Sequence, residues 1–300
     1  MMPAPTSARV RDGLKSTLDR LYAEYNRAEA VADPIDIVRR YPARRDREVV
    51  GFCAAGLAFG RVASVLQSIE RLLAVLGPSP AAFVREFDPR RDGQAFEPLV
   101  HRWTRGDALA ALVLALRRMT DEAGSIEGFF LLGHDAARPD VEASIESFSR
   151  RALALVAGDA HARPTGVSYF FPRPSAGSAC KRLNLYLRWM VRADAVDLGV
   201  WSGVSRSQLV VPLDVHVIRL GQCLGLTRYR SPGWRMASEI TASLRQLDPD
   251  DPVRYDFALC HVGMRDQCGF NRPFGDSRCP MRGWCRPGRH RRPVSRRPSG

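Results

Sequence analysis

Residues 177–192 read GSACKRLNLYLRWMVR, a loop of small residues followed by an amphipathic run. Apolar side chains recur here at helical spacing, which predicts a helix over 179–193. The apolar face of that helix carries Leu183, Tyr186, Leu187 and Met190. A polar stripe on the opposite face is made of Lys181, Asn184, Arg188 and Arg192. The stretch therefore predicts a helix with one face for the core and one face for a ligand.

Lys181 opens this helix and is one of two lysines in the chain. The sequence holds 45 lysines and arginines together, and the other lysine is Lys15. An amine can lose its proton and become a nucleophile, whereas a guanidinium in practice cannot. Lys181 is therefore a candidate for covalent chemistry, and an ordinary surface lysine is the alternative. Free backbone N–H groups in a first helical turn suit a phosphate. This makes five residues candidate contacts for the phosphates of a nucleic acid: Gly177, Ser178, Asn184, Arg188 and Arg192.

Asp214 precedes a second apolar run, LVVPLDVHVIRLGQCLGL at 209–226. Its position predicts that it caps a helix from residue 214 to about 224 by accepting hydrogen bonds from backbone N–H groups. One interpretation is that Asp214 only caps. The other is that the capping carboxylate also points into a cleft and acts on a ligand.

The remaining pattern is helical nearly throughout, so the predicted fold class is all-α. Further helices are expected over 7–30, 33–42, 46–76, 80–87, 106–120, 124–132 and 139–157, and from Asp250 or Asp251 onward. Proline, glycine and serine are frequent in 158–178, which is expected to connect two lobes. The lobes would span roughly 1–158 and 170–285, or be interleaved, within one domain over 1–285. A β-like segment, SQLVVPL, precedes Asp214.

The chain is strongly basic, with a net charge of +13. Its segment 286–300 holds six arginines and no acid, and is expected to be a disordered tail. This charge favours a polyanionic partner, most simply nucleic acid, although an arginine-rich proteome would also produce it. The longest uncharged apolar stretch of the N-terminal half, 51–60, is too short for a membrane span. The N-terminus lacks the apolar region of a secretory signal, so a cytoplasmic protein is expected.

The chain resembles the helix-hairpin-helix (HhH-GPD) DNA glycosylases in the order of its motifs. A short loop is followed by a lysine that opens one helix, and PLDVH opens another helix. A bacterial branch of this superfamily, whose function is unknown, is similar to the chain over four segments: GSACKRLNLYLRWMVR, VDLGVW, PLDVHVIRL and DPDDPVRYDFALC. That branch is itself similar to the archaeal 8-oxoguanine glycosylases. The resemblance covers roughly 170–285, with weaker similarity in DREVVGFCAAGLAFGRV. Two features depart from the family. The hairpin GSAC has one glycine in place of a G-x-G motif. Lys181 and Asp214 are 33 residues apart, which is longer than in the endonuclease III branch and more like the archaeal branch.

The resemblance implies a two-lobed helix-hairpin-helix fold and a function in base-excision repair. Lys181 would be the Schiff-base nucleophile and Asp214 the carboxylate beside it, in a bifunctional DNA glycosylase and abasic-site lyase. The partner would be double-stranded DNA with a damaged base, 8-oxoguanine first, bound by a monomer at the nucleoid. A non-catalytic DNA-binding protein and an all-α protein acting on RNA are the alternatives. Candidate wedge residues, each also a candidate for the core, are Tyr169, Phe170, Phe171, Trp189 and Trp201.

The C-terminal cysteines resemble the cluster loop of endonuclease III-like enzymes. Cys268, Cys279 and Cys285 match three of its ligands. Cys260 is a candidate for the fourth, although its place inside an apolar helix favours a core residue. An iron–sulfur cluster and a zinc site completed by a histidine are open alternatives. A loop without metal ranks first, so no cofactor is expected.

Overall fold

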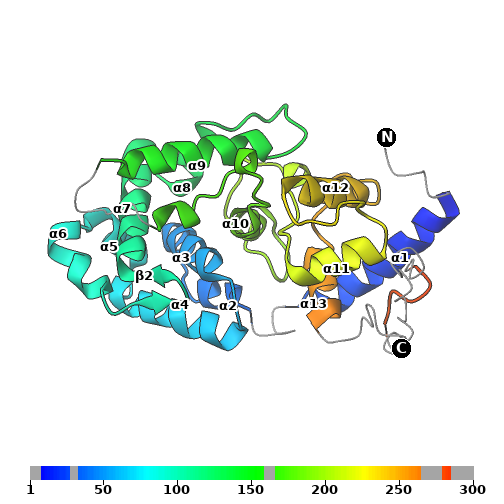
Figure 1. Ribbon diagram of the computed structural model, residues 1–300, viewed down its shortest axis with the longest axis horizontal. Coiled ribbons are helices and arrows are strands. Elements are labelled where there is room, and N and C mark those ends of the chain that lie inside the picture. The colour runs from blue at the N-terminus through cyan, green and yellow to red at the C-terminus, as the bar shows by residue number, and fades with distance from the viewer. Residues whose placement is uncertain (1–7, 28–32, 159–165, 265–278, 285–300) are drawn as a thin grey trace, which may run out of the picture.

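Helices make up most of the computed structural model, which describes residues 8–27, 33–158, 166–264 and 279–284 (Figure 1). The first half contains α1 (Ala8–Tyr25), α2 (Ile35–Arg39), α3 (Arg44–Leu57), α4 (Val62–Leu76), α5 (Pro80–Glu86), α6 (Pro89–Asp92), α7 (Gly106–Ala123), α8 (Ile126–Leu131) and α9 (Glu142–Val156). The second half contains α10 (Lys181–Val191), α11 (Val215–Cys223), α12 (Trp234–Arg245) and α13 (Asp256–Met264). The one sheet of the described ranges pairs β1 (Val100–His101) with β2 (Thr104–Arg105). The predicted all-α class is confirmed.

Helix α10 lies at the centre of the molecule (Figure 1). Helices α3 to α9 lie on one side of it, and α1, α11, α12 and α13 lie on the other. Helix α1 packs on α13 although the two are far apart in the sequence. Tyr255, just before α13, donates a hydrogen bond to Asp19 of α1 at 2.7 Å. The N-terminal helix therefore belongs with the C-terminal helices.

The apolar face predicted for α10 is buried against α3. Leu183, Tyr186, Leu187 and Met190 are each at most 4% exposed. A Cβ atom at Gly51 of α3 would lie only 2.8 Å from the Met190 side chain, so this glycine permits the close approach of the two helices. The Tyr186 hydroxyl donates to the Glu48 carbonyl oxygen at 3.1 Å, which satisfies the one polar group on this face. These contacts fix the helix that carries Lys181.

Three element boundaries differ from the predictions. The expected helix over 46–76 is two helices, because the chain turns between α3 and α4, where Gly60 has a φ of +115°. The last helix begins at Asp256 rather than near Pro252, after turns at 252–255. The segment 209–213 is buried and irregular rather than a strand.

Helix α12 was missed by the sequence analysis. Its buried residues recur at helical spacing, which is the signal that could have revealed it: Met236, Ala237, Ile240, Thr241 and Leu244. No helix of the described ranges combines the length and the apolar character that crossing a membrane requires. The arginine-rich segment 286–300 lies outside the described residues.

Candidate active site

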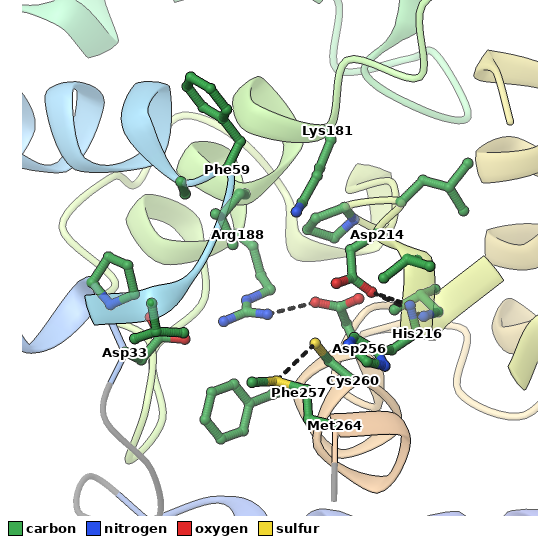
Figure 2. A pocket seen from close by; sticks show the side chains of 18 of the residues that line it. Asp33, Phe59, Lys181, Arg188, Asp214, His216, Asp256, Phe257, Cys260 and Met264 are labelled. Atoms are coloured by element: carbon green, nitrogen blue, oxygen red, sulfur yellow. Dashed lines mark hydrogen bonds and ion pairs between the residues drawn. The ribbon is translucent and has the colours of Figure 1, made fainter. Parts of the chain in front are cut away.

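A cavity of about 450 Å³ opens where the two groups of helices meet α10. Its walls come from the turn between α3 and α4, from α10, from the start of α11 and from α13. This volume lies within the usual range for small-molecule sites, about 300–1,000 Å³. Lys181 and Asp214 both line it. Figure 2 shows their side chains entering the cavity from different elements and pointing toward one another.

Lys181 is the first residue of α10. The loop before it uses the left-handed conformation twice, at Gly177 (φ +78°) and at Cys180 (φ +49°). This conformation costs a cysteine more than a glycine. The Cys180 amide donates to the Ser178 hydroxyl at 3.1 Å, which helps to hold the loop. Lys181 has no ion pair with any described residue, whereas Lys15 pairs with Asp19 at 2.7 Å. The amine of Lys181 therefore lies at the cavity without an ion pair to a described carboxylate.

Asp214 caps α11, as predicted. Its Oδ1 atom accepts hydrogen bonds from the backbone N–H groups of His216 at 2.8 Å and Val217 at 3.0 Å. The Oδ2 atom has no hydrogen bond to the described residues. The cap fixes the orientation of the carboxylate, so the two interpretations of Asp214 are compatible: one oxygen caps, and the other is available to a ligand in the cavity.

A second carboxyl group, that of Asp256, lines the same cavity and was missed by the sequence analysis. Its Oδ2 accepts a hydrogen bond from Arg188 Nη1 at 2.5 Å. Burial raises the pKa of Asp256 to about 6. The positive charge of Arg188 lowers this pKa, and the nearby carboxylates of Asp214 and Asp197 raise it further. Asp256 Oδ1 and Arg188 Nη2 are buried and have no partner among the described residues. They leave an acceptor and a donor for a polar ligand.

The raised pKa of Asp256 predicts a pH-dependent stability. Below pH 6 the folded protein keeps this proton, whereas the unfolded chain loses it above the ordinary value of 3.8. The stability that the proton contributes is therefore lost as the pH rises through 6. Asp256→Asn cannot titrate, so its free energy of unfolding should improve relative to the wild type by about 1 kcal/mol between pH 5 and 7. Denaturant unfolding of both proteins at each pH checks this, and a constant difference would contradict it.

Beyond Lys181, the polar stripe predicted on α10 is buried, which corrects the expectation that its side chains contact DNA. Asn184, Arg188 and Arg192 are 1%, 3% and 4% exposed. Asn184 donates to the Ala179 carbonyl oxygen at 3.1 Å, inside the loop before α10. Of the five candidate DNA contacts, Gly177 is exposed and Ser178 is half-buried.

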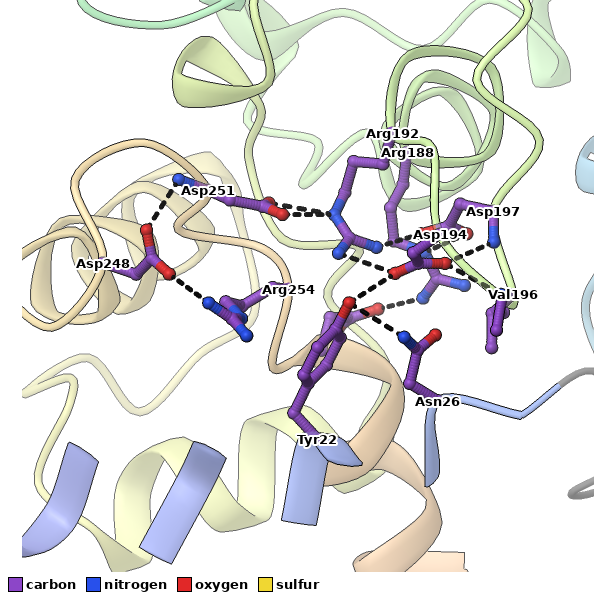
Figure 3. A network of polar contacts seen from close by, with 12 residues as sticks. Tyr22, Asn26, Arg188, Arg192, Asp194, Val196, Asp197, Asp248, Asp251 and Arg254 are labelled. Atoms are coloured by element: carbon purple, nitrogen blue, oxygen red, sulfur yellow. Dashed lines mark hydrogen bonds and ion pairs between the residues drawn. The ribbon is translucent and has the colours of Figure 1, made fainter. Parts of the chain in front are cut away.

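Both arginines of the stripe are used inside the protein (Figure 3). Arg192 pairs with Asp251 at 2.9 Å, with Asp194 at 2.9 Å and with Asp197. Arg188 pairs with Asp197 at 3.1 Å as well as with Asp256. A buried charge is tolerated when it is paired in this way. The network joins α10 to the residues around α13 and orients the helix rather than contacting a phosphate.

Four of the five candidate wedge residues form core, which was the alternative for each of them. Those four, each at most 4% exposed, are Phe170, Phe171, Trp189 and Trp201. Tyr169 is half-buried under the Arg182 guanidinium, whose central carbon lies 3.2 Å from the ring centroid. Phe59 and Phe257 line the cavity instead, together with Trp189.

The metal prediction concerns residues that are only partly described. Cys268 and Cys285 lie outside the described residues. Cys260 lines the cavity and its sulfur contacts Met264 Sδ at 3.9 Å, while Cys279 is buried. Within the described part of the chain, no three histidine, cysteine, aspartate or glutamate side chains form a group that could hold a metal ion. The iron–sulfur and zinc alternatives stay predictions about the C-terminal segment.

Comparison with known proteins gives a family and no activity. No curated protein matches the chain, and no solved structure matches it either. The family described as "Protein of unknown function (DUF2400)" matches residues 33–265. This range runs from α2 through α13 and includes Lys181, Asp214 and Asp256. Because it covers well over half of the 300 residues, the chain belongs to the DUF2400 family.

Proposed function

We propose that the protein is a bifunctional DNA glycosylase and abasic-site lyase that removes a damaged base from double-stranded DNA. The observation that carries the proposal is that Lys181 and Asp214, 33 residues apart in the sequence, line one cavity. One supplies an amine without an ion pair among the described residues, and the other a carboxylate oriented by a helix cap. This is the pair that a Schiff-base glycosylase needs.

The reaction would begin with a nucleotide that leaves the base stack and enters the cavity. As the bond between C1′ and the base weakens, positive charge develops on the sugar. The Asp214 carboxylate would stabilise this charge, because it is held in place before the charge appears. The nitrogen of Lys181 attacks C1′ with its lone pair as the bond to the base breaks, and the departing base takes up the proton that this nitrogen loses.

Strand cleavage would follow from the same covalent bond. The C1′–O4′ bond opens and gives an imine between C1′ and the Lys181 nitrogen. Loss of a proton from C2′ then expels the 3′ phosphate, which breaks the strand. Water hydrolyses the imine and returns the free amine. One lysine would therefore link base removal to strand cleavage.

The arrangement of the helices supports the two-lobed helix-hairpin-helix interpretation. Helix α10 lies between two groups of helices, and the loop before it has left-handed residues at both ends, Gly177 and Cys180. Two 3-10 turns, Val167–Tyr169 and Pro174–Ala176, precede this loop in the described residues. Such a hairpin would be a shortened form of the family motif. A net charge of +13 suits a DNA partner.

The test is borohydride trapping combined with a panel of lesion duplexes. Borohydride reduces an imine to a stable amine, so a mixture of the protein and an abasic duplex should give a covalent protein–DNA species. Strand cleavage of duplexes that each carry one damaged base, 8-oxoguanine first, would identify the substrate. DNA binding without trapping or cleavage would favour the non-catalytic alternative. Preferential competition by an RNA duplex would favour action on RNA.

A further inference from the structure

The β1–β2 hairpin presents an exposed tryptophan at its tip. Arg102 and Trp103 form the two-residue turn between the strands, and Arg102 has a φ of +54°. Trp103 is 61% exposed. Five large hydrophobic side chains are exposed in the described part of the chain, and Trp103 is the aromatic one among them. An aromatic ring usually gains free energy when it is buried, and an exposed indole forgoes this gain. An exposed tryptophan can therefore mark a binding surface.

The exposed ring is nevertheless held in place. Its centroid lies 4.7 Å from the ring of Phe59, and Tyr169 meets its edge at 5.7 Å. The neighbouring His101 is 4% exposed and contacts the Ser68 hydroxyl at 2.8 Å and the Phe59 carbonyl oxygen at 3.1 Å. Because both the strand and the supporting ring are fixed, Trp103 presents a rigid face rather than a mobile side chain.

The hairpin tip lies against two residues that line the cavity. Phe59, which supports Trp103, is one of the residues that line the cavity (Figure 2). Gly60 also lines it, and a Cβ atom there would lie 2.9 Å from Arg102 Nε. Two of the other exposed apolar side chains, Val215 and Met264, line the cavity from α11 and α13. Exposed apolar surface therefore gathers around this one opening.

The charge beside Trp103 is positive. Arg102 and Arg105 of the hairpin are exposed, as is Arg61, which precedes α4 next to Gly60. The hairpin segment 98–106 contains no acidic residue. An aromatic ring flanked by arginines is complementary to stacked bases flanked by phosphates.

We propose that Trp103 is a wedge that enters the DNA duplex beside the extruded nucleotide. This proposal rests on the proposed function, because a wedge is needed where a nucleotide leaves the stack. The indole stacks in the gap that the nucleotide vacates, and Arg102 and Arg105 contact the flanking phosphates. Trp103 thereby opposes the return of the nucleotide while the cavity holds it.

Binding to a duplex with a stable tetrahydrofuran abasic analogue tests the wedge. Trp103→Ala should weaken this binding by about 5- to 100-fold, the usual effect of losing one base–aromatic stack. Affinity for an undamaged duplex should change less. Leu132→Ala is the matched control, since Leu132 is 59% exposed and does not line the cavity. Its affinity should match that of the wild type.

Tryptophan fluorescence gives a direct readout of stacking. Trp189, Trp201 and Trp234 are at most 5% exposed and Trp284 is half-buried, so the part of the DNA-induced quench that disappears in Trp103→Phe reports on Trp103. Trp103→Phe keeps an aromatic ring and should bind within a few-fold of wild type while its quench becomes clearly smaller. A quench of unchanged size in Trp103→Phe, or unchanged affinity and cleavage in Trp103→Ala, would overturn the wedge.

Cleavage of two abasic substrates separates the wedge from the enzyme. In a single strand no nucleotide has to be extruded, so Trp103→Ala should cleave a single-stranded abasic site as fast as the wild type. Cleavage of the duplex site should fall with its affinity. Equal losses on both substrates would place Trp103 in general DNA binding and reject the wedge. If the wild type cleaves neither substrate, the proposed function itself fails.

Discussion

Replacing Lys181 with arginine is expected to abolish borohydride trapping and strand cleavage while duplex affinity stays within a few-fold. The guanidinium keeps the positive charge at the start of α10, so electrostatic attraction to DNA survives. It cannot lose its proton at working pH, so no imine forms. Trapping yield, single-turnover cleavage and binding, all measured on one abasic duplex, check this expectation.

Lys15→Arg is the matched control for that experiment. It makes the same chemical change at the other lysine, which lies on α1 and pairs with Asp19. This variant should trap and cleave like the wild type. Retained trapping in Lys181→Arg would place the nucleophile elsewhere, at Lys15 or at the N-terminal amine. Loss of binding together with cleavage would make Lys181 a phosphate clamp and contradict the enzymatic proposal.

Asp214→Asn is expected to slow base release by about 100- to 1,000-fold, which is the usual effect of losing one preorganised electrostatic partner of a transition state. The amide oxygen can still accept the hydrogen bonds from His216 and Val217, so the cap and the fold should hold. Single-turnover release of the base from a lesion duplex measures the effect. Borohydride trapping on a preformed abasic duplex should fall less, because the base has already left.

Thermal unfolding separates the two roles of Asp214. Asp214→Ala removes both the cap and the charge, and should cost about 1 kcal/mol more stability than Asp214→Asn. The two variants should be similarly slow in base release. A wild-type rate in Asp214→Asn would mean that the carboxylate is only a cap.

The local features of the candidate site could be predicted from the sequence. Helical spacing predicted α10 and its apolar face, and the position of Asp214 before a helix predicted its cap. These features depend on interactions within a few residues along the chain. The meeting of Lys181 and Asp214 in one cavity was expected from the family resemblance, because periodicity does not say how helices pack.

The tertiary features of the site could not be predicted in this way. Arg188 and Arg192 lie on the polar side of α10, and their burial depends on carboxylates brought from 194–197 and 251–256. Without those partners a buried guanidinium would be too costly, so the sequence alone favoured exposure. Trp103 could not be singled out from the sequence either, since an aromatic residue usually indicates core and this one lies at the surface.

The packing of α1 on α13 sets the order in which the nascent chain can fold. Helix α1 leaves the ribosome about 230 residues before α13 is made, roughly ten to fifty seconds at the usual rate of synthesis. Three side chains of α1 are buried in the folded protein: Leu18, Leu21 and Tyr25. Until α13 is made, they lack the helix on which α1 packs. During that time they are exposed apolar surface of the kind that chaperones bind. The wall of the cavity that holds Asp256 is made last, so a chain released before α13 would carry Lys181 and Asp214 but no completed cavity.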